Sequence, residues 1–336
     1  MTTYILRRLL LMIPTLLGIT LVCFILIQFV PGGPVEQVIS KVRAYGSSRG
    51  ASAKAISQEE IQNITAYFGF DQPAYIRYLR WLGNVCRGDL GKSYVYQQPV
   101  LQVIVSKFPV SVLFGLSSFI LSYLISIPLG VRKAISHGGV FDAASSAVIF
   151  AGYVMPGYTL GILLIIFFAG GSYFDWFPIG NLVSENFESL SFWGKTLDVG
   201  RHMVLPLTCY MASEFALLTL LMKNSMLDEI SKEYMRTALA KGLSFRQAVW
   251  RQAFRNGLIP IATGIGSIFA ILFTSALLIE RVFDLDGMGL LFYNSILSRD
   301  YNVVLGIIVL SSFFTMLGRL FSDLIYVVID PRIRFD

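Results

Sequence analysis

Long apolar stretches separated by polar segments dominate the chain. A bilayer core of roughly 30 Å requires about 20 apolar residues of helix, because lipid offers no partner to an unpaired backbone amide. Six stretches meet this requirement: 9–30, 109–131, 143–171, 203–222, 258–279 and 303–329. The fourth contains Glu214 and the sixth contains Arg319 and Asp323, whereas the others are uncharged. The pattern predicts an all-α, polytopic membrane protein with six transmembrane helices.

Composition supports this prediction and excludes other classes. Only 14% of the 336 residues are charged and 55% are hydrophobic, whereas an average soluble domain carries roughly 25% charged residues. A cytosolic enzyme of this length would need more charge to cover its surface, and a disordered chain would have less apolar area to bury. The three cysteines lie far apart in the sequence. We therefore expect neither a disulfide framework nor a metal site.

Basic residues indicate the orientation, because short cytoplasmic segments are enriched in Lys and Arg. The segment 223–257 alone carries seven basic residues, and the short outer loops carry few. Both termini are therefore expected on the cytoplasmic side. The first stretch is 22 residues long, which is too long for a signal-peptide core, so we expect it to remain as an anchor. The expected organisation is residues 1–30 with the first helix, a lobe at 31–108 and a permease core at 109–336.

The segment between the first two stretches is expected to form a small helical lobe outside the cytoplasm. Ser57 followed by Glu60 is a capping-box signature that predicts a helix ending near Phe68. A second helix is predicted over residues 74–86 from the spacing of its apolar side chains. This lobe has two possible roles that the sequence does not separate: binding a soluble partner, and covering the helix bundle.

The inner segment 223–257 has the pattern of a docking element. Ser225 and Ser244 are each followed three residues later by Asp or Gln, which predicts two helix starts, and Gly242 predicts a helix stop between them. A solvated loop held near anionic lipid is the alternative interpretation. The small residues Ala238, Ala240 and Gly242 favour docking, because small side chains allow another surface to approach closely.

Several motifs carry a resemblance to a known family. Residues 234–244 (YMRTALAKGLS), followed by 254–260 (FRNGLIP), resemble the cytoplasmic loop of ABC-importer permeases of the oligopeptide and dipeptide type. Residues 169–175 (AGGSYFD) resemble the Yej-type subgroup, which implies import of peptides including microcin C. Further similar motifs occur in family order at 7–10, 29–34, 88–93, 280–283, 287–291, 298–301 and 330–333.

The resemblance implies a division of labour in a bacterial inner membrane. This chain would have the type I permease fold and pair with a second, homologous permease in a heterodimer. A periplasmic binding protein would deliver peptides, and an ABC ATPase with two nucleotide-binding domains, fused in the subgroup or separate, would bind ATP and Mg²⁺. The chain itself has no G-x-x-x-x-G-K-[ST] loop, so we expect no ATPase activity and no cofactor on it. Nucleic acid is not an expected partner, whereas membrane lipid is.

The resemblance assigns ATPase coupling to the inner segment, with Arg236 and Lys241 in polar contact at the rim of a groove and Ala238 and Gly242 setting the approach distance. The predicted coupling residues are Tyr234, Arg236, Thr237, Ala238, Ala240, Lys241, Gly242 and Ser244.

The charged residues of the predicted spans have two interpretations. Arg319 and Asp323 are four residues apart on one helix face, which favours an ion pair that Glu214 could join. Alternatively, Glu214 lines the substrate path and attracts the positive N-terminus of a peptide. Glu280 and the neighbouring Arg281 are candidates for contact with the binding protein, and the alternative for Glu280 is that it is solvated at the interface.

Two other classes of protein remain as alternatives. An ATP-independent secondary transporter or channel subunit is the main one, although no internal repeat supports it. An intramembrane enzyme would need a nucleophile and a base within the spans, and that pattern is missing from the sequence.

Overall fold

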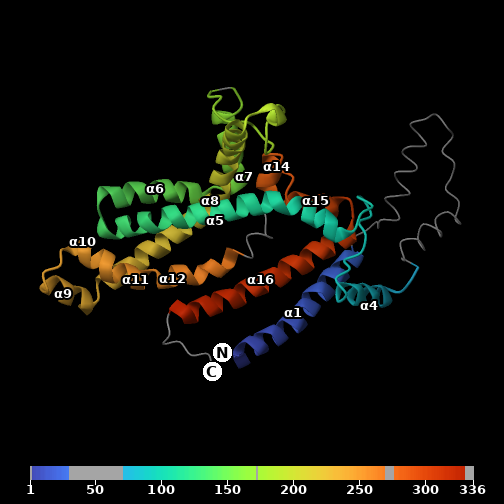
Figure 1. Cartoon of the computed structure of the whole chain (residues 1–336), viewed down its shortest axis with the longest axis horizontal. Coiled ribbons are helices and arrows are strands. Elements are labelled where there is room, and N and C mark those ends of the chain that lie inside the picture. The colour runs from blue at the N-terminus through green and yellow to red at the C-terminus, as the bar shows by residue number, and fades with distance from the viewer. Residues whose placement is uncertain (1, 30–70, 172, 269–275, 330–336) are drawn as a thin grey trace. The chain divides into compact units, whose positions relative to one another are not determined.

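The computed structural model describes residues 2–29, 71–171, 173–268 and 276–329. These residues are almost entirely helical, and the one extended pairing among them is an isolated bridge between Lys92 and Pro99. The all-α prediction is therefore confirmed for this part of the chain (Figure 1). The predicted helix from Ser57 to Phe68 lies outside the described residues.

Among the described residues, four helices are long and apolar enough to cross a membrane. They contain the first, second, fourth and sixth predicted stretches. These helices are α1 (Thr2–Phe29), α5 (Val100–Ile135), α8 (Phe192–Ile230) and α16 (Tyr301–Ile329). The 39 residues of α8 would extend about 58 Å, so this helix must continue well beyond a bilayer core.

The third predicted stretch is not one continuous helix, so a single span over these residues stays a prediction. It consists of α6 (Val140–Val154) and α7 (Gly157–Phe168), which are bent by 105° relative to each other. Pro156 causes the break, because it disfavours the helical conformation in the residue before it. Met155 accordingly has φ −80° and ψ 125°. Counted together, the pair raises the number of candidate spans in the described chain to five.

The fifth predicted stretch, 258–279, is described only in part. Its beginning forms two short elements, α12 (Ile259–Ala262) and the 3-10 helix η3 (Thr263–Ser267). Residues 269–275 lie outside the described chain, and α14 (Leu277–Val282) follows. A sixth span therefore stays a prediction, as does the orientation of the termini.

The described chain divides into two compact units. The first consists of 1–6, 109–290 and 314–336. In it, α6 and α7 both pack against α8, and α7 also packs against α14. Gly161 of α7 allows a close approach to α14, because a Cβ there would lie 2.9 Å from the Phe283 ring.

The same unit contains the predicted inner segment as four short helices. They are α9 (Glu233–Ala240), α10 (Phe245–Ala248), the π-helix η2 (Val249–Ala253) and α11 (Phe254–Gly257). Ser244 caps α10 in a complete capping box with Gln247, as predicted. Ser225 does not start a helix: α8 runs unbroken past it, and its hydroxyl donates to the Gly257 carbonyl at 2.9 Å. That earlier prediction was wrong because the serine bonds to a distant carbonyl instead of a local amide.

The second unit consists of 7–108 and 291–313. Here α4 (Ala74–Val85) matches the second helix predicted for the outer lobe. Tyr78 of α4 packs against Phe24 of α1 and Leu305 of α16, and its hydroxyl lies 3.1 Å from the Thr20 hydroxyl. The short apolar helix α15 (Met288–Leu297) contributes to both units, as do α1, α5 and α16.

A buried carboxylate holds the turn between α4 and α5 in this unit. Asp300 has no exposed surface. It accepts hydrogen bonds from the Ser93 hydroxyl and from the amides of Tyr94 and Val95, the latter two at 3.1 Å. These partners lie more than 200 positions away in the sequence. The bonds therefore fasten the start of α16 to the segment that precedes α5.

Replacing this carboxylate should destabilise the second unit. In Asp300→Ala, a buried hydroxyl and two amides lose their acceptor, at a cost of about 3 kcal/mol. Asp300→Asn keeps one carbonyl acceptor and should lose less. The thermal unfolding midpoint of the purified protein in detergent should fall in the order wild type, Asn, Ala. A midpoint for Asp300→Ala equal to that of the wild type would contradict the assignment.

Candidate functional site

The helix α9 turns one face into its own unit and presents the other to the outside. Met235 and Ala238 are only 1% and 2% exposed, and they lie in a buried cluster with Met222 and Met226 of α8. Arg236, Thr237 and Ala240 are exposed. A partner could therefore contact α9 only through its exposed face.

The expectation that Ala238 sets the distance to a partner was wrong. Its side chain packs inward, against a cluster that includes Ala248, Val249 and Ala253. A small residue is needed there because α9 lies close to the following helices of the same chain. The sequence pattern shows that a small residue is required, but it does not show on which side the close neighbour lies.

Gly242 acts through its backbone conformation. Its φ is +87°, in the left-handed region, and nothing lies within 4 Å of the position where a Cβ would be. The Gly242 amide donates to the Leu239 carbonyl, and the Leu243 amide donates to the Ala238 carbonyl. These two bonds form a Schellman motif, which ends α9 and satisfies two of its last carbonyl groups. The predicted helix stop is therefore confirmed, whereas the steric role expected for Gly242 toward a partner stays a prediction.

A cluster of polar groups fastens α9 to the end of α8. The Tyr234 hydroxyl donates to one oxygen of Glu229 and the Lys232 ammonium donates to the other, both at 2.6 Å. The Asn256 amide of α11 donates to the Tyr234 hydroxyl at 3.5 Å. Burial, reinforced by the bond to Glu229, raises the pKa of Tyr234 to about 12. Tyr234 therefore stays a hydrogen-bond donor at physiological pH and links three helices.

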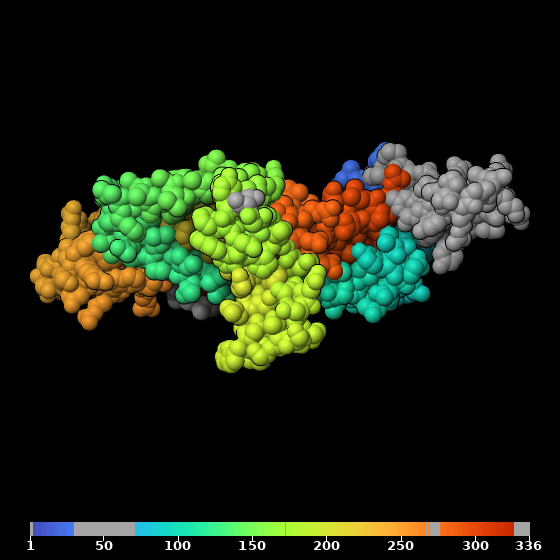
Figure 2. Space-filling view, turned by 90° about the horizontal axis from the view of Figure 1, so that it is seen from above, coloured from blue at the N-terminus to red at the C-terminus, as the bar shows by residue number. Residues whose placement is uncertain are grey.

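The exposed side of the inner segment carries large apolar residues that sequence reasoning missed. Leu239, Phe245 and Trp250 are 41%, 42% and 43% exposed. Exposed basic residues accompany them in the same segment: Arg236, Lys241, Arg246, Arg251 and Arg255. We call these three apolar and five basic residues the inner face. Figure 2 shows the part of the surface formed by this segment, coloured orange. The sequence does contain a signal that could have revealed this surface, namely large apolar side chains within a strongly basic segment.

A buried ionic cluster ties α5, α6 and α8 together. Lys133 has no exposed surface, and its ammonium group contacts the Asp142 carboxylate at 3.1 Å. It also donates to the Ser145 and Ser146 hydroxyls at 2.7 and 2.8 Å. Lys223 of α8 pairs with the other Asp142 oxygen at 2.8 Å. Lys133 therefore connects helices within the protein.

The structure gives a position for each candidate substrate-path residue, but the described contacts do not join them into one site. Glu214 is half-buried in α8. Asp323 of α16 accepts a hydrogen bond from the Tyr4 hydroxyl at 2.8 Å, and Arg319 is exposed. The ion pair of Arg319 with Asp323, and its extension to Glu214, stay predictions.

Glu280 is not at the surface of the described chain, so its position agrees neither with contact to a binding protein nor with solvation at the interface. The residue is 1% exposed, and its carboxylate accepts from the Leu290 amide at 2.8 Å and from the Tyr210 hydroxyl at 3.3 Å. It therefore satisfies the N-terminus of α15, where a negative charge is favourable. The neighbouring Arg281 is exposed and keeps its predicted role in contacting a binding protein.

Among the described residues, no group of three or more His, Cys, Asp or Glu side chains could hold a metal ion. The geometry is that of a helical membrane protein with an inner segment fastened to one long helix. It shows a surface suited to binding another protein.

Comparisons with known proteins agree with this class. Residues 126–335 match the family described as binding-protein-dependent transport system inner membrane component. The chain is 44% identical over 360 residues to the peptidoglycan transport system permease protein YejB of Agrobacterium fabrum, covering 100% of this chain and 99% of that protein. It is 41% identical over 362 residues to the inner membrane ABC transporter permease protein YejB of Escherichia coli O157:H7, with both chains fully covered. It is also 32% identical over 336 residues to the oligopeptide transport system permease protein AppB of Bacillus subtilis, again over the whole of both chains.

The chain therefore belongs to the family of inner membrane components of binding-protein-dependent transport systems. This result confirms the family resemblance and the location in the inner membrane. It decides against the ATP-independent transporter and the intramembrane enzyme.

The conformation at Gly242 gives a testable prediction. Gly242→Val places a β-branched residue in the left-handed region, at a cost of about 1–2 kcal/mol. The Schellman bonds should weaken, and the amides of residues 242 and 243 should exchange faster with deuterium. Gly242→Asn is the matched control, because Asn tolerates this conformation. Equal amide protection in the two variants would show that the left-handed turn is not what fixes the end of α9.

Proposed function

We propose that this chain is one of two homologous permease subunits of an ATP-driven importer of peptides, and that its inner face binds the ATPase. The observation that carries the proposal is the exposed apolar group of Leu239, Phe245 and Trp250 on a segment whose opposite side is fastened to α8. Aromatic and Arg residues contribute the largest share of binding energy in protein interfaces. A separate ABC ATPase, with two nucleotide-binding domains that are fused or on two chains, would bind ATP and Mg²⁺.

Coupling requires that force applied at the inner face reach the membrane helices. The bonds of Tyr234 and Lys232 to Glu229 and the packing of Met235 on Met222 and Met226 provide this connection. The Lys133–Asp142–Lys223 cluster then joins α8 to α5 and α6. Closure of the ATPase would therefore displace several helices together.

Peptides are the proposed substrate class, delivered by a periplasmic binding protein. The names of the similar permeases indicate oligopeptide transport in one case and peptidoglycan transport in another. Microcin C follows from the Yej-type resemblance alone. Within this proposal, Arg281 is the exposed candidate for contact with the binding protein.

The inner face can be tested by substitution. Trp250→Ala removes an exposed aromatic side chain, and we expect the affinity of the permease for its ATPase to fall roughly tenfold or more. Binding would be measured with both permease chains in nanodiscs and the purified ATPase. Leu197→Ala is the matched control, because Leu197 is a 67% exposed apolar residue near the start of α8, far from the inner face in sequence. Unchanged affinity in Trp250→Ala, or an equal loss in Leu197→Ala, would contradict the docking role.

The proposed role of Glu214 has its own test. Glu214→Gln removes a negative charge while keeping the side-chain shape, so ATP-dependent uptake of a peptide with a free N-terminus should fall. Uptake of the same peptide with an acetylated N-terminus should change little. Glu188→Gln, at an exposed position outside the membrane-spanning stretches, is the control. If Glu214→Gln took up each of the two peptides as fast as the wild type does, Glu214 would not belong to the substrate path.

A further inference from the structure

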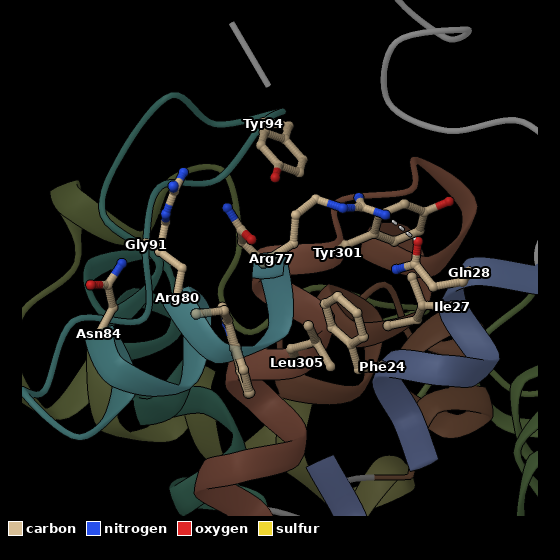
Figure 3. Close-up of a pocket in the computed structure, with 12 residues that line it drawn as sticks. Phe24, Ile27, Gln28, Arg77, Arg80, Asn84, Gly91, Tyr94, Tyr301 and Leu305 are labelled. Atoms are coloured by element: carbon tan, nitrogen blue, oxygen red, sulfur yellow. Dashed lines mark hydrogen bonds between the residues drawn. The ribbon is translucent and has the colours of Figure 1, made fainter. Parts of the chain in front are cut away.

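A cavity in the second unit has basic and aromatic walls that the proposed function does not use. Its volume is about 290 Å³, and it lies between the C-terminal part of α1, the helix α4 and the start of α16. The lining residues in the described chain include Arg77 and Arg80 but no Asp or Glu. Figure 3 shows Arg77 extended toward Gln28 on one side of the cavity and Arg80 on the other side, with the Tyr94 ring above.

Several hydrogen-bond donors surround this space. Arg77 donates to the side-chain amide oxygen of Gln28 at 2.5 Å, and Arg80 is exposed. The indole N–H of Trp81 is buried and has no hydrogen-bond partner among the described residues. Burial lowers the pKa of Arg77, and it raises the pKa of Tyr94 to about 12 together with the nearby Asp300. Two arginines and no carboxylate in the described lining make an oxygen-rich anion a favourable occupant.

The cavity continues into an apolar groove. This groove has a volume of about 420 Å³ and lies between α1 and α4. Phe24 and Gln28 line both spaces, which places the basic cavity and the groove side by side. The groove also exposes Leu21, Ile25 and Leu79, which are 43%, 44% and 61% exposed. It therefore offers hydrocarbon contacts next to a set of cationic donors.

We propose that this site binds one anionic phospholipid, with its phosphate between Arg77 and Arg80 and an acyl chain along the groove between α1 and α4. Arginine suits phosphate because its planar donors match the phosphate oxygens. A basic amphipathic helix with an aromatic side is also the form that lies at a membrane surface. Since α1 is a candidate membrane span, the groove on it is accessible to lipid chains. A free phosphate would satisfy the donors but would leave the groove unfilled.

Quenching of Trp81 fluorescence tests the site in the full chain. Trp176, Trp193 and Trp250 are replaced by Phe, which leaves Trp81 as the single tryptophan. The protein is placed in vesicles that contain brominated phosphatidylglycerol or, at the same mole fraction, brominated phosphatidylcholine. We expect stronger quenching by the anionic lipid. Equal quenching by both lipids, as expected for a groove that the rest of the chain covers, would overturn the proposal.

Substitution separates a specific site from general attraction to an anionic surface. The double variant Arg77→Gln/Arg80→Gln should lower the preference for phosphatidylglycerol roughly three- to tenfold. Arg87→Gln is the matched control, because Arg87 is exposed, follows α4 and does not line the cavity. The Arg87→Gln variant should keep its preference for phosphatidylglycerol, with only the small change expected from removing one surface charge. An equal loss in Arg87→Gln would indicate surface attraction only and contradict the site.

Two competitors complete the test. Inorganic phosphate at millimolar concentration should leave the quenching by phosphatidylglycerol unchanged, because it lacks the acyl chain. Full displacement by phosphate would show a free-anion site instead of a lipid site. Displacement by a short acidic peptide at the same concentration would indicate a protein-binding surface, and would equally overturn the proposal. None of these outcomes depends on ATPase binding at the inner face.

Discussion

The attachment of α9 to the end of α8 is the interaction on which a transport mechanism for this chain depends. Glu229 accepts hydrogen bonds from Tyr234 and Lys232 at 2.6 Å. Met235 and Ala238 of α9 are also buried, in a cluster that contains Met222 and Met226 of α8. A polar clamp and an apolar contact together fix the orientation of a helix of only eight residues. Such a short helix would not be stable alone, so its structure comes from this attachment.

The same principle recurs at the other helix junctions. Asp142 joins Lys133 and Lys223, Glu280 satisfies the N-terminus of α15, and Asp300 holds the turn before α5. Each carboxylate is at least nine-tenths buried and bonds to groups on other elements. Breaking such a buried network lowers the free energy of unfolding more than removing a surface ion pair does. A chain with few charges thus places several of them where helices must keep their relative positions.

Features that depend on local sequence could be predicted. The six apolar stretches located the four long helices, Gly242 marked the end of α9, and Ser244 with Gln247 marked the start of α10. These signals act within a few residues and follow from backbone geometry and bilayer thickness. The inner segment was predicted to be a docking element because its motif is also local, and that role stays a prediction.

Features that depend on distant contacts could not be predicted. The 105° bend at Pro156 is an example, since proline also occurs within the intact helices α5 and α8. The inward direction of Ala238 and the partners of Asp300 depend on which helices pack together. The exposed Leu239, Phe245 and Trp250 were overlooked because apolar residues in a membrane protein are first assigned to lipid or core. Burial in the folded chain was needed to show that these three are at the surface.

A distance measurement within the assembled transporter tests most directly whether α9 moves as a rigid extension of α8. Spin labels would be placed at Leu217, which is 56% exposed on α8, and at the exposed Ala240 of α9, after Cys23, Cys86 and Cys209 are replaced by serine. Double electron–electron resonance would be recorded without nucleotide and with ATP bound. A rigid attachment predicts the same narrow distance distribution in both states. A shifted or broadened distribution on ATP binding would show that α9 moves independently of α8.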